Sequence, residues 1–294
     1  MSLGYGIVTP VLNQANELRR LASSVLEQTI APTAWVVVDQ ASADGSRTIA
    51  ENLAREHSWI RVVATTIDGT RVAPTVHAFH AGLVELDPTP DVVVRLDADT
   101  PLDRGYFARL LRERVREADP AAAARPETDE EHGVWRQRHG TGPGVWGACR
   151  AYRSDCLNDI LPLEEHMGWD GLDLAKAAVK GWGARVLFDL PFRHHRTEGI
   201  RDGARFRTWV IQGEATHFMS YRVSYLLVRT LYRVVRDPAA VGLLLGYARA
   251  AVNRRPKCAD VEIRDYVRKQ QAIRRLPRRI REARRTRAQL VEPS

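Results

Sequence analysis

The sequence predicts an α/β protein built around a mainly parallel sheet. Over the first hundred residues, short apolar runs rich in β-branched residues alternate with segments of helical periodicity, as in strand and crossover-helix units. The runs are Tyr5–Thr9, Ala34–Asp39, Ile60–Ala64 and Asp91–Leu96. Because polar residues hardly alternate within them, they are typical of strands buried on both faces of a sheet.

The helix expected between the first two strands spans Asn16–Gln28. Its apolar residues recur at helical spacing and form one stripe, and Asn16 is a residue type that caps helices. We therefore assign this stripe to the core. The stripe consists of Leu18, Leu21, Ala22, Val25 and Leu26.

The next part of the chain is less regular, and its elements are predicted from turn residues as much as from periodicity. They are, in order, a helix over about Asp103–Glu117, a polar stretch over 120–133, a glycine-rich segment over 139–148 that leads to a strand, a helix from Asp170 that stops at Gly181, and a strand over Ala184–Phe188.

Composition indicates a folded protein with a sizeable core. The 294 residues are 44% hydrophobic and 27% charged, which excludes collagen-like and wholly disordered chains. Cys149, Cys156 and Cys258 are too few and too irregularly spaced for a disulfide framework or a four-cysteine zinc site, which favours a reducing compartment. Pro10 interrupts the only apolar run near the N-terminus, so no secretory signal is expected.

The basic character is concentrated near the C-terminus. The formal net charge is +8, yet residues 254–288 hold 14 Lys/Arg and 4 Asp/Glu, a net charge of +10 that leaves −2 for the rest. A nearly neutral body argues against nucleic acid as a partner, and a basic end favours attachment to an anionic surface. We expect a cytoplasmic protein, with peripheral attachment to the inner face of the cell membrane left open.

A single amphipathic helix is predicted from Thr216 onward. It would place four arginines on one face, with apolar residues opposite. Such a helix suits packing on its own domain or on a second subunit, and it equally suits an anionic membrane surface. The short apolar run over 241–248 and the basic tail are further reasons to expect attachment to a membrane. The arginines are Arg222, Arg229, Arg233 and Arg236.

Polar residues follow three of the predicted strands. They occur in the segments 9–13 and 39–45 and in Asp97-Ala98-Asp99. In open α/β sheets ligands bind beyond the carboxyl ends of the strands, and carboxylates spaced as in D-x-D are suitable ligands for Mg²⁺ or Mn²⁺. Alone, such a triplet is also common in surface turns.

Taken in order, TPVLNQANELRRLASSVLEQT, VVVDQASADGS and VVVRLDADT resemble glycosyltransferase family 2, the inverting enzymes with the GT-A fold. The resemblance covers residues 5–100 and resumes at 144–153 and 169–195. It implies a GT-A fold with a C-terminal helical extension. It also implies metal-dependent, inverting transfer of a sugar from a nucleoside-diphosphate sugar to an acceptor hydroxyl, in polysaccharide or glycolipid biosynthesis, with Mg²⁺ or Mn²⁺ as cofactor.

The resemblance assigns nucleotide-sugar binding to Thr9, Asn13, Asp39 and Asp97, and with less support to Arg71. Asp99 would bind the metal directly, with Asp97 contacting the ribose or the water shell of the metal. His195, or else His194, would complete the metal shell. Gln40 departs from the usual second Asp, which leaves the base preference open. Arg193 or Arg196 would contact the diphosphate.

The resemblance makes Asp170 the catalytic base, with Asp173 in reserve. Asp170 also suits helix capping, which remains the alternative role. Trp146 and Trp169 are suited to stacking on sugars or to core packing.

The predicted organisation has three parts: 1–100 binds the nucleotide sugar, 101–215 binds the acceptor, and 216–294 is an amphipathic and basic helical extension. The acceptor would be a saccharide or lipid-linked saccharide, and homo-oligomers are also compatible with the sequence. The competing functions are a sugar nucleotidyltransferase and a catalytically degenerate GT-A binding module.

Overall fold

The computed structural model describes residues 3–66, 73–116, 121–129, 135–137, 145, 147–194, 205–275, 277 and 280–281. The chain divides into two compact units. The sheet unit comprises residues 1–139, 143–165 and 180–197, and the helical unit comprises 140–142, 166–179 and 198–294. This division follows packing, whereas the predicted three-part division follows function and stays a prediction.

Four strands form the N-terminal half of the sheet as predicted. β1 (Tyr5–Val11) lies between β2 (Ala34–Asp39) and β4 (Val92–Leu96), and β3 (Ile60–Ala64) pairs with the far side of β2. All of these pairs are parallel. Every residue of β1, β2 and β4 is buried, which explains their unbroken apolar character.

The other half of the sheet is mixed. β7 (Cys149–Arg153) runs antiparallel to β4, β5 (Ala121–Asp129) pairs with β7, β6 (Trp135–Gln137) and β8 (Ala184–His194), and only β5 and β8 are parallel. The prediction of a polar stretch at 120–133 was therefore wrong, because β5 lies there. Its four alanines and polar tail carry no alternating pattern, so pairing with its neighbours determines the strand.

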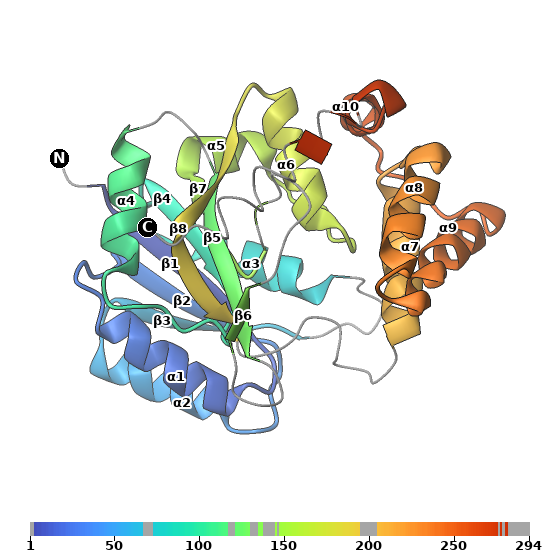
Figure 1. The fold of residues 1–294 in the computed structure, drawn as a ribbon. Helices are drawn as coiled ribbons and strands as arrows, with labels where there is room; N and C mark the ends of the chain where they lie inside the picture. The colour runs from blue at the N-terminus through green and yellow to red at the C-terminus, as the bar shows by residue number, and fades with distance from the viewer. Residues whose placement is uncertain are drawn as a thin grey trace. The chain divides into compact units, whose positions relative to one another are not determined.

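Helices cover both faces of the sheet (Figure 1). The main core packs β1, β2 and β4 against α1 (Ala15–Leu26), α2 (Ser46–Glu56) and α4 (Tyr106–Arg116). The opposite face of β1 and β2 receives α3 (Pro74–Val84). A further helix, α5 (Ser154–Ile160), follows β7. These layers confirm the predicted α/β class.

The helical unit consists of short helices. They are α6 (Trp169–Val179), α7 (Arg205–Phe218), α8 (Val223–Val234), the 3₁₀ turn η1 (Pro238–Val241), α9 (Gly242–Val252), α10 (Val261–Gln270) and the 3₁₀ turn η2 (Ile273–Arg275). The predicted start of α6 and its stop are confirmed, since Gly181 adopts the left-handed conformation, with φ of 87°, just beyond the helix.

The prediction of one continuous helix from Thr216 was wrong. α7 ends at Phe218, Ser220 takes a positive φ of 59°, and Arg222 precedes α8 in an extended conformation. Phe218 and Met219 pack into a small core with residues of α6 and α10, and this core holds the bend in place. Arg222 therefore does not share a helix with the later arginines.

The apolar run at 241–248 packs mainly inside the helical unit. Gly213 of α7 faces Gly246 of α9 so closely that a Cβ on either would overlap the backbone of the other helix. Leu243 is completely buried beside them. Gly242, Leu243 and Gly246 of this run therefore serve helix packing, whereas Val241 and Leu245 are exposed, and a role at a membrane stays a prediction. In the part of the chain that the structure describes, no helix is long and apolar enough to cross a membrane.

Gly82 sets the distance between α3 and the sheet. A Cβ built on Gly82 would lie 2.4 Å from Cγ1 of Val8 and 2.9 Å from Cγ2 of Val38. Both valines are completely buried in strands, so neither has room to move aside.

We predict that Gly82→Ala destabilises the protein by about 1–3 kcal/mol through overpacking. The usual gain for Gly to Ala inside a helix, about 1 kcal/mol, would have the opposite sign. Urea unfolding measures the change. Gly105→Ala is the control, because its Cβ meets no atom within 4 Å, and equal stability of both variants would contradict the prediction.

Candidate functional site

The carboxyl ends of β2, β1 and β4 lie next to one another at one edge of the sheet. The register pairs Val11, the last residue of β1, with Asp39, the last residue of β2. The D-x-D sequence begins directly after Leu96, at the end of β4. Since these strands are parallel neighbours, the structure brings the predicted nucleotide-binding and metal-binding segments to a common edge.

Hydrogen bonds join the turn after β1 to the turn after β2. The backbone N–H of Asn13 donates to Oγ of Ser42 at 3.0 Å, and the backbone N–H of Ala43 donates to Oδ1 of Asn13 at 2.8 Å. Asn13 has a positive φ of 51°, a conformation that asparagine tolerates better than most residues. The side chain that the sequence assigned to nucleotide binding therefore also holds the two turns together.

The second turn also caps the first helix. Oδ2 of Asp44 accepts a hydrogen bond from the backbone N–H of Ala15 at 2.9 Å, and Oγ of Ser46 accepts one from Gln14 at 3.0 Å. The predicted capping role of Asn16 was wrong, because α1 starts at Ala15 and its capping groups come from about 30 residues further along the chain.

The pKa of the Asp44 carboxyl lies below its ordinary value. Asp44 is exposed, and its limited desolvation raises this pKa, but hydrogen bonds from the Ser46 hydroxyl and from the backbone N–H groups of Ala15 and Ser46 outweigh that effect. Asp44 is thus held as a carboxylate at the start of α1, where the helix dipole favours a negative charge.

Asp39 is buried at the end of β2. Its carboxylate accepts a weak hydrogen bond from the backbone N–H of Ser42, at 3.3 Å and 3.4 Å to the two oxygens, and its carbonyl accepts from the N–H of Thr65. The adjacent Gln40 is also buried, and its backbone N–H donates to the carbonyl of Val11. The turn therefore determines the position of the Asp39 side chain.

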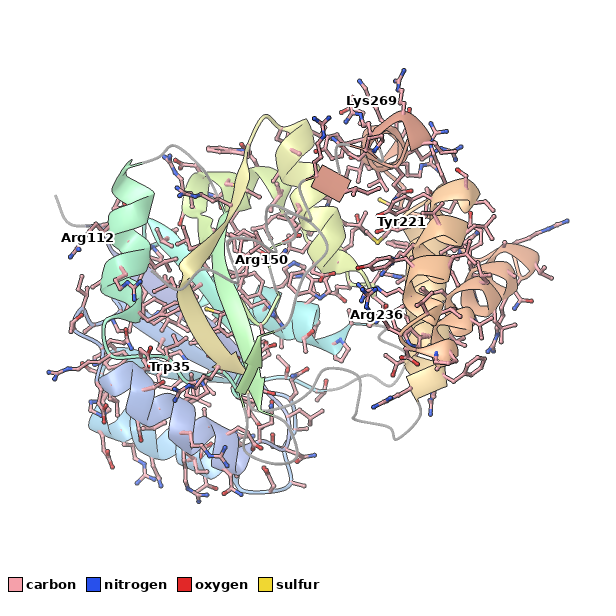
Figure 2. The ribbon with its side chains drawn as sticks, in the orientation of Figure 1. Trp35, Arg112, Arg150, Tyr221, Arg236 and Lys269 are labelled. Atoms are coloured by element: carbon pink, nitrogen blue, oxygen red, sulfur yellow. The ribbon has the colours of Figure 1, made fainter. Side chains whose placement is uncertain are left out.

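Thr9 is completely buried in β1. Its hydroxyl oxygen accepts a hydrogen bond from the indole nitrogen of Trp35 at 2.9 Å, and Figure 2 labels this tryptophan within the sheet unit. The structure thus gives Thr9 a partner in the core, while its role in nucleotide binding stays a prediction.

The D-x-D segment forms a tight turn beyond β4. The backbone N–H of Thr100 donates to the carbonyl of Asp97, and the N–H of Asp97 donates to the carbonyl of Ala148 next to β7. Oδ1 of Asp97 forms an ion pair with Nη2 of Arg95 at 2.8 Å, whereas Asp99 is buried. The two carboxylates therefore have different surroundings.

Arg95 and Arg150 form a buried pair that the sequence reasoning missed. They face each other across β4 and β7, both are buried, and they donate to the backbone carbonyls of Gly147 and Val145 respectively. Figure 2 labels Arg150 in the interior of the sheet unit. An arginine is costly to bury without partners. Its presence in the apolar run VVVRL was therefore the one sequence feature that indicated a buried polar contact at this position.

The donor chemistry of this edge fits a hard divalent cation. Asp97 and Asp99 offer carboxylate oxygens, the ligand type that Mg²⁺ and Mn²⁺ prefer. Among the described residues, no group of three or more His, Cys, Asp and Glu forms a metal site. Arg71, Trp146, His195 and Arg196 lie outside the described residues, and for His194 only the backbone in β8 is described.

The predicted base lies at the start of α6 in the helical unit. Gly168 has a positive φ of 89°, Trp169 is buried, and Asp170 is exposed in the first turn of the helix. Asp173 is buried, and its Oδ1 accepts a hydrogen bond from the N–H of Leu174 at 2.6 Å. Asp170 is therefore the more accessible of the two carboxylates.

Comparison with known families decides the classification. The family described as glycosyl transferase family 2 matches residues 6–226, which include the strand-end segments and α6. The chain belongs to glycosyl transferase family 2. The family resemblance of the sequence motifs is thereby confirmed.

The relatives of this family 2 glycosyltransferase include uncharacterized glycosyltransferases of Mycobacterium tuberculosis and Mycobacterium bovis. Each is 28% identical over 191 residues, which covers 60% of this chain and 79% of the relative.

Solved structures share the fold. A mannosyltransferase of Pyrobaculum calidifontis, in complex with GDP-Man and Mn²⁺, has a TM-score of 0.59 and 17% identity, with 99% of this chain and 86% of that chain covered. TarS 1-349 of S. aureus has a TM-score of 0.54 and 16% identity, with coverages of 98% and 88%. These similarities confirm the GT-A fold of this family 2 glycosyltransferase.

We predict that Asp44→Asn lowers the stability of the protein at neutral pH by about 0.3–1 kcal/mol, because the amide still accepts a hydrogen bond but the negative charge at the start of α1 is lost. Because the folded-state pKa is lowered, the stabilisation is present above the ordinary carboxyl pKa and is lost as the pH falls through the lowered value. Urea unfolding at neutral pH and at about pH 3 should show the difference shrinking in acid. Glu56→Gln, at an exposed site, is the control, and a difference independent of pH would contradict this explanation.

Proposed function

We propose that this glycosyltransferase moves a sugar from a nucleoside-diphosphate sugar to an acceptor hydroxyl, with inversion and with the help of Mg²⁺ or Mn²⁺. The acceptor would be a saccharide or lipid-linked saccharide of polysaccharide or glycolipid biosynthesis. The observation that carries the proposal is the common sheet edge at which Asp39 ends β2 and the D-x-D turn follows β4, on either side of the parallel strand β1.

The donor is assigned to this edge by its chemistry. Asp39 offers carboxylate oxygens as acceptors for the donor groups of a base, and the joined turns around Asn13 hold that carboxylate in place. Structural relatives were solved in complex with GDP-Man and with UDP, which supports a nucleoside-diphosphate donor as a class. Gln40 leaves the choice of base open, because an amide both donates and accepts hydrogen bonds.

The two D-x-D carboxylates are assigned different roles. The 2.8 Å ion pair with Arg95 engages one carboxylate oxygen of Asp97, which suits Asp97 for the ribose or metal-bound water, and the family resemblance assigns Asp99 as the direct metal ligand. A divalent cation held there supplies Lewis-acid stabilisation of the charge that develops on the departing nucleoside diphosphate. The Mn²⁺ complex of the P. calidifontis relative supports this cofactor class.

Asp170 is assigned as the general base. Inversion requires one group that removes the proton of the acceptor hydroxyl as its oxygen attacks the anomeric carbon. Asp170 lies in the first turn of α6, and its exposure leaves it accessible to an acceptor. Buried Asp173 is the reserve.

We expect GDP or UDP to bind in the presence of Mn²⁺, and Asp99→Ala to weaken that binding by at least about tenfold through loss of a metal ligand. Isothermal titration of each nucleotide, with Mn²⁺ and with EDTA, measures the effect. Asp103→Ala removes an exposed carboxylate four residues away and should bind as wild type does. Equal affinities in EDTA and Mn²⁺ would refute the metal role.

For the chemical step, Asp170→Asn should lower turnover by roughly 10²–10⁴-fold, the usual contribution of a general base, while nucleotide affinity stays nearly unchanged. Release of nucleoside diphosphate from candidate donors, in the presence of saccharide acceptors, measures turnover. Asp173→Asn should have the smaller effect on turnover, and the reverse order would make Asp173 the base.

The same assay separates the competing functions. A sugar nucleotidyltransferase would release pyrophosphate from a nucleoside triphosphate, and a degenerate binding module would bind nucleotide without turnover. Either result would overturn the proposed transfer.

A further inference from the structure

α8 exposes a broad apolar face. It buries Leu226 and Thr230, whereas Leu231 is 68% exposed and Val235 is 85% exposed. Large hydrophobic side chains at intervals of about four residues form one continuous face along the helix. We call this face the α8 stripe; it consists of Val223, Leu227, Val228, Leu231, Tyr232 and Val235.

Three arginines run beside the C-terminal half of the stripe. The guanidinium of Arg236 lies 4.6 Å from the ring centre of Tyr232, and that of Arg229 lies 5.8 Å from the ring centre of Tyr221. Figure 2 labels Arg236 and Tyr221 on the helical unit. Arg233 lies between the other two arginines, at i+4 from Arg229 and i−3 from Arg236, so the three positive charges crowd together.

No carboxylate balances this arginine group among the residues that the structure describes. The ion pairs of the described residues include none to Arg229, Arg233 or Arg236, and the nearby Asp237 accepts hydrogen bonds from Trp209 and Ala239. Burial, followed by the charges of Arg229 and Arg236, lowers the pKa of Arg233. Such a cluster is stabilised when an anion approaches it.

A second group of cations lies at the N-terminal end of the stripe. A surface hollow of about 570 Å³ there contains four cationic side chains and one carboxylate, and a smaller adjoining hollow connects Val228 of the stripe to exposed Ile273. Figure 2 labels Lys269 on the outer side of α10. The charged residues of the larger hollow are Arg222, Asp265, Arg268, Lys269 and Arg274.

The sequence extends this basic region. Residues 274–287, which begin within η2, contain eight arginines and one glutamate. In sequence, these residues carry a net charge of +7, which includes Arg274 of the hollow.

The combination of an apolar face with cations beside it and at its end distinguishes between partners. Nucleic acid would match the cations but offers no apolar phase for Leu231 and Val235. A second copy paired through α8 would bring one cationic group against another in either helix orientation. An anionic bilayer accepts apolar side chains at its interface and places phosphates beside the arginines.

We propose that α8 docks in the surface of an anionic lipid bilayer, with the α8 stripe in the interface and the flanking arginines on lipid phosphates. This docking surface differs from the arginine face expected from the sequence, since the apolar side of α8 faces outward. The purpose of docking rests on the proposed function, because a lipid-linked acceptor would be presented at that surface; the docking itself does not.

Co-sedimentation of the 294-residue chain with vesicles tests the proposal. Vesicles of equimolar phosphatidylcholine and phosphatidylglycerol should bind the chain, vesicles of phosphatidylcholine alone should bind it weakly, and added salt should release it. Leu231→Ser/Val235→Ser should weaken partitioning by at least about tenfold, since two buried aliphatic side chains are lost from the interface. Arg229→Gln/Arg236→Gln should weaken it by about tenfold or more.

Matched controls remove similar groups elsewhere. Val84→Ser/Val252→Ser changes two valines that are 81% and 80% exposed outside α8. Arg19→Gln/Arg20→Gln removes the same charge from exposed positions of α1. Both controls should bind vesicles as the unchanged chain does, and circular dichroism with thermal unfolding should show that every variant is folded.

Three results would overturn the proposal: no binding by the unchanged chain, equal loss in test and control pairs, or self-association in light scattering that the stripe variant abolishes. Loss of binding only when residues after Lys257 are deleted, with both α8 variants unaffected, would assign the contact to the tail and also overturn it. Mn²⁺-dependent nucleotide binding, measured on the same samples, reports on the proposed function separately.

Discussion

The hydrogen bonds between the turns after β1 and β2 are the constraint on which one edge of the sheet depends. This edge, at the carboxyl ends of β2, β1 and β4, is where the sugar donor is proposed to bind. Asn13 and Ser42 join the two turns, and Asp44 and Ser46 supply the capping groups that α1 lacks in its own sequence. Neither turn keeps its shape without the other, because each satisfies backbone groups of its neighbour. The direct consequence is a fixed position for Asp39, whose carboxylate is bound within the second turn. For the proposed function, an edge that protein hydrogen bonds hold in place would reduce the ordering cost of donor binding.

The buried Arg95 holds the D-x-D turn through an ion pair, much as hydrogen bonds hold the turns after β1 and β2. Arg95 pairs with Asp97 and also donates to Gly147, so it connects β4 to the segment that leads into β7. The ion pair gives Asp97 a protein counter-charge, and this supports the division of roles proposed for the two aspartates. This division follows from one strand residue that is unusual in a buried parallel strand.

The strands of the parallel half were predictable because β-branched runs buried on both faces carry their own signal, and the D-x-D and second-turn residues follow directly from those strand ends. Interactions between distant segments were not predictable. The cap of α1 comes from Asp44, β5 depends on its neighbours more than on its alanines, and Thr9 meets Trp35 across two strands. In each case the deciding partner is absent from the local window of sequence, so periodicity contains no information about it.

In the helical unit, glycines pack α7 closely against α9, and α8 keeps an exposed apolar face. Gly213 and Gly246 bring α7 and α9 into backbone contact, with Leu243 buried beside them. Phe218 and Met219 meanwhile bind α7 to α6 and α10 through a separate core. α8 fully buries Leu226 and Thr230 and leaves a row of large apolar side chains exposed. An exposed apolar face of this size is the kind of feature that marks an interaction surface. The same helix carries three arginines that have no carboxylate partner among the described residues. The apolar face and the positive charge therefore lie together on α8.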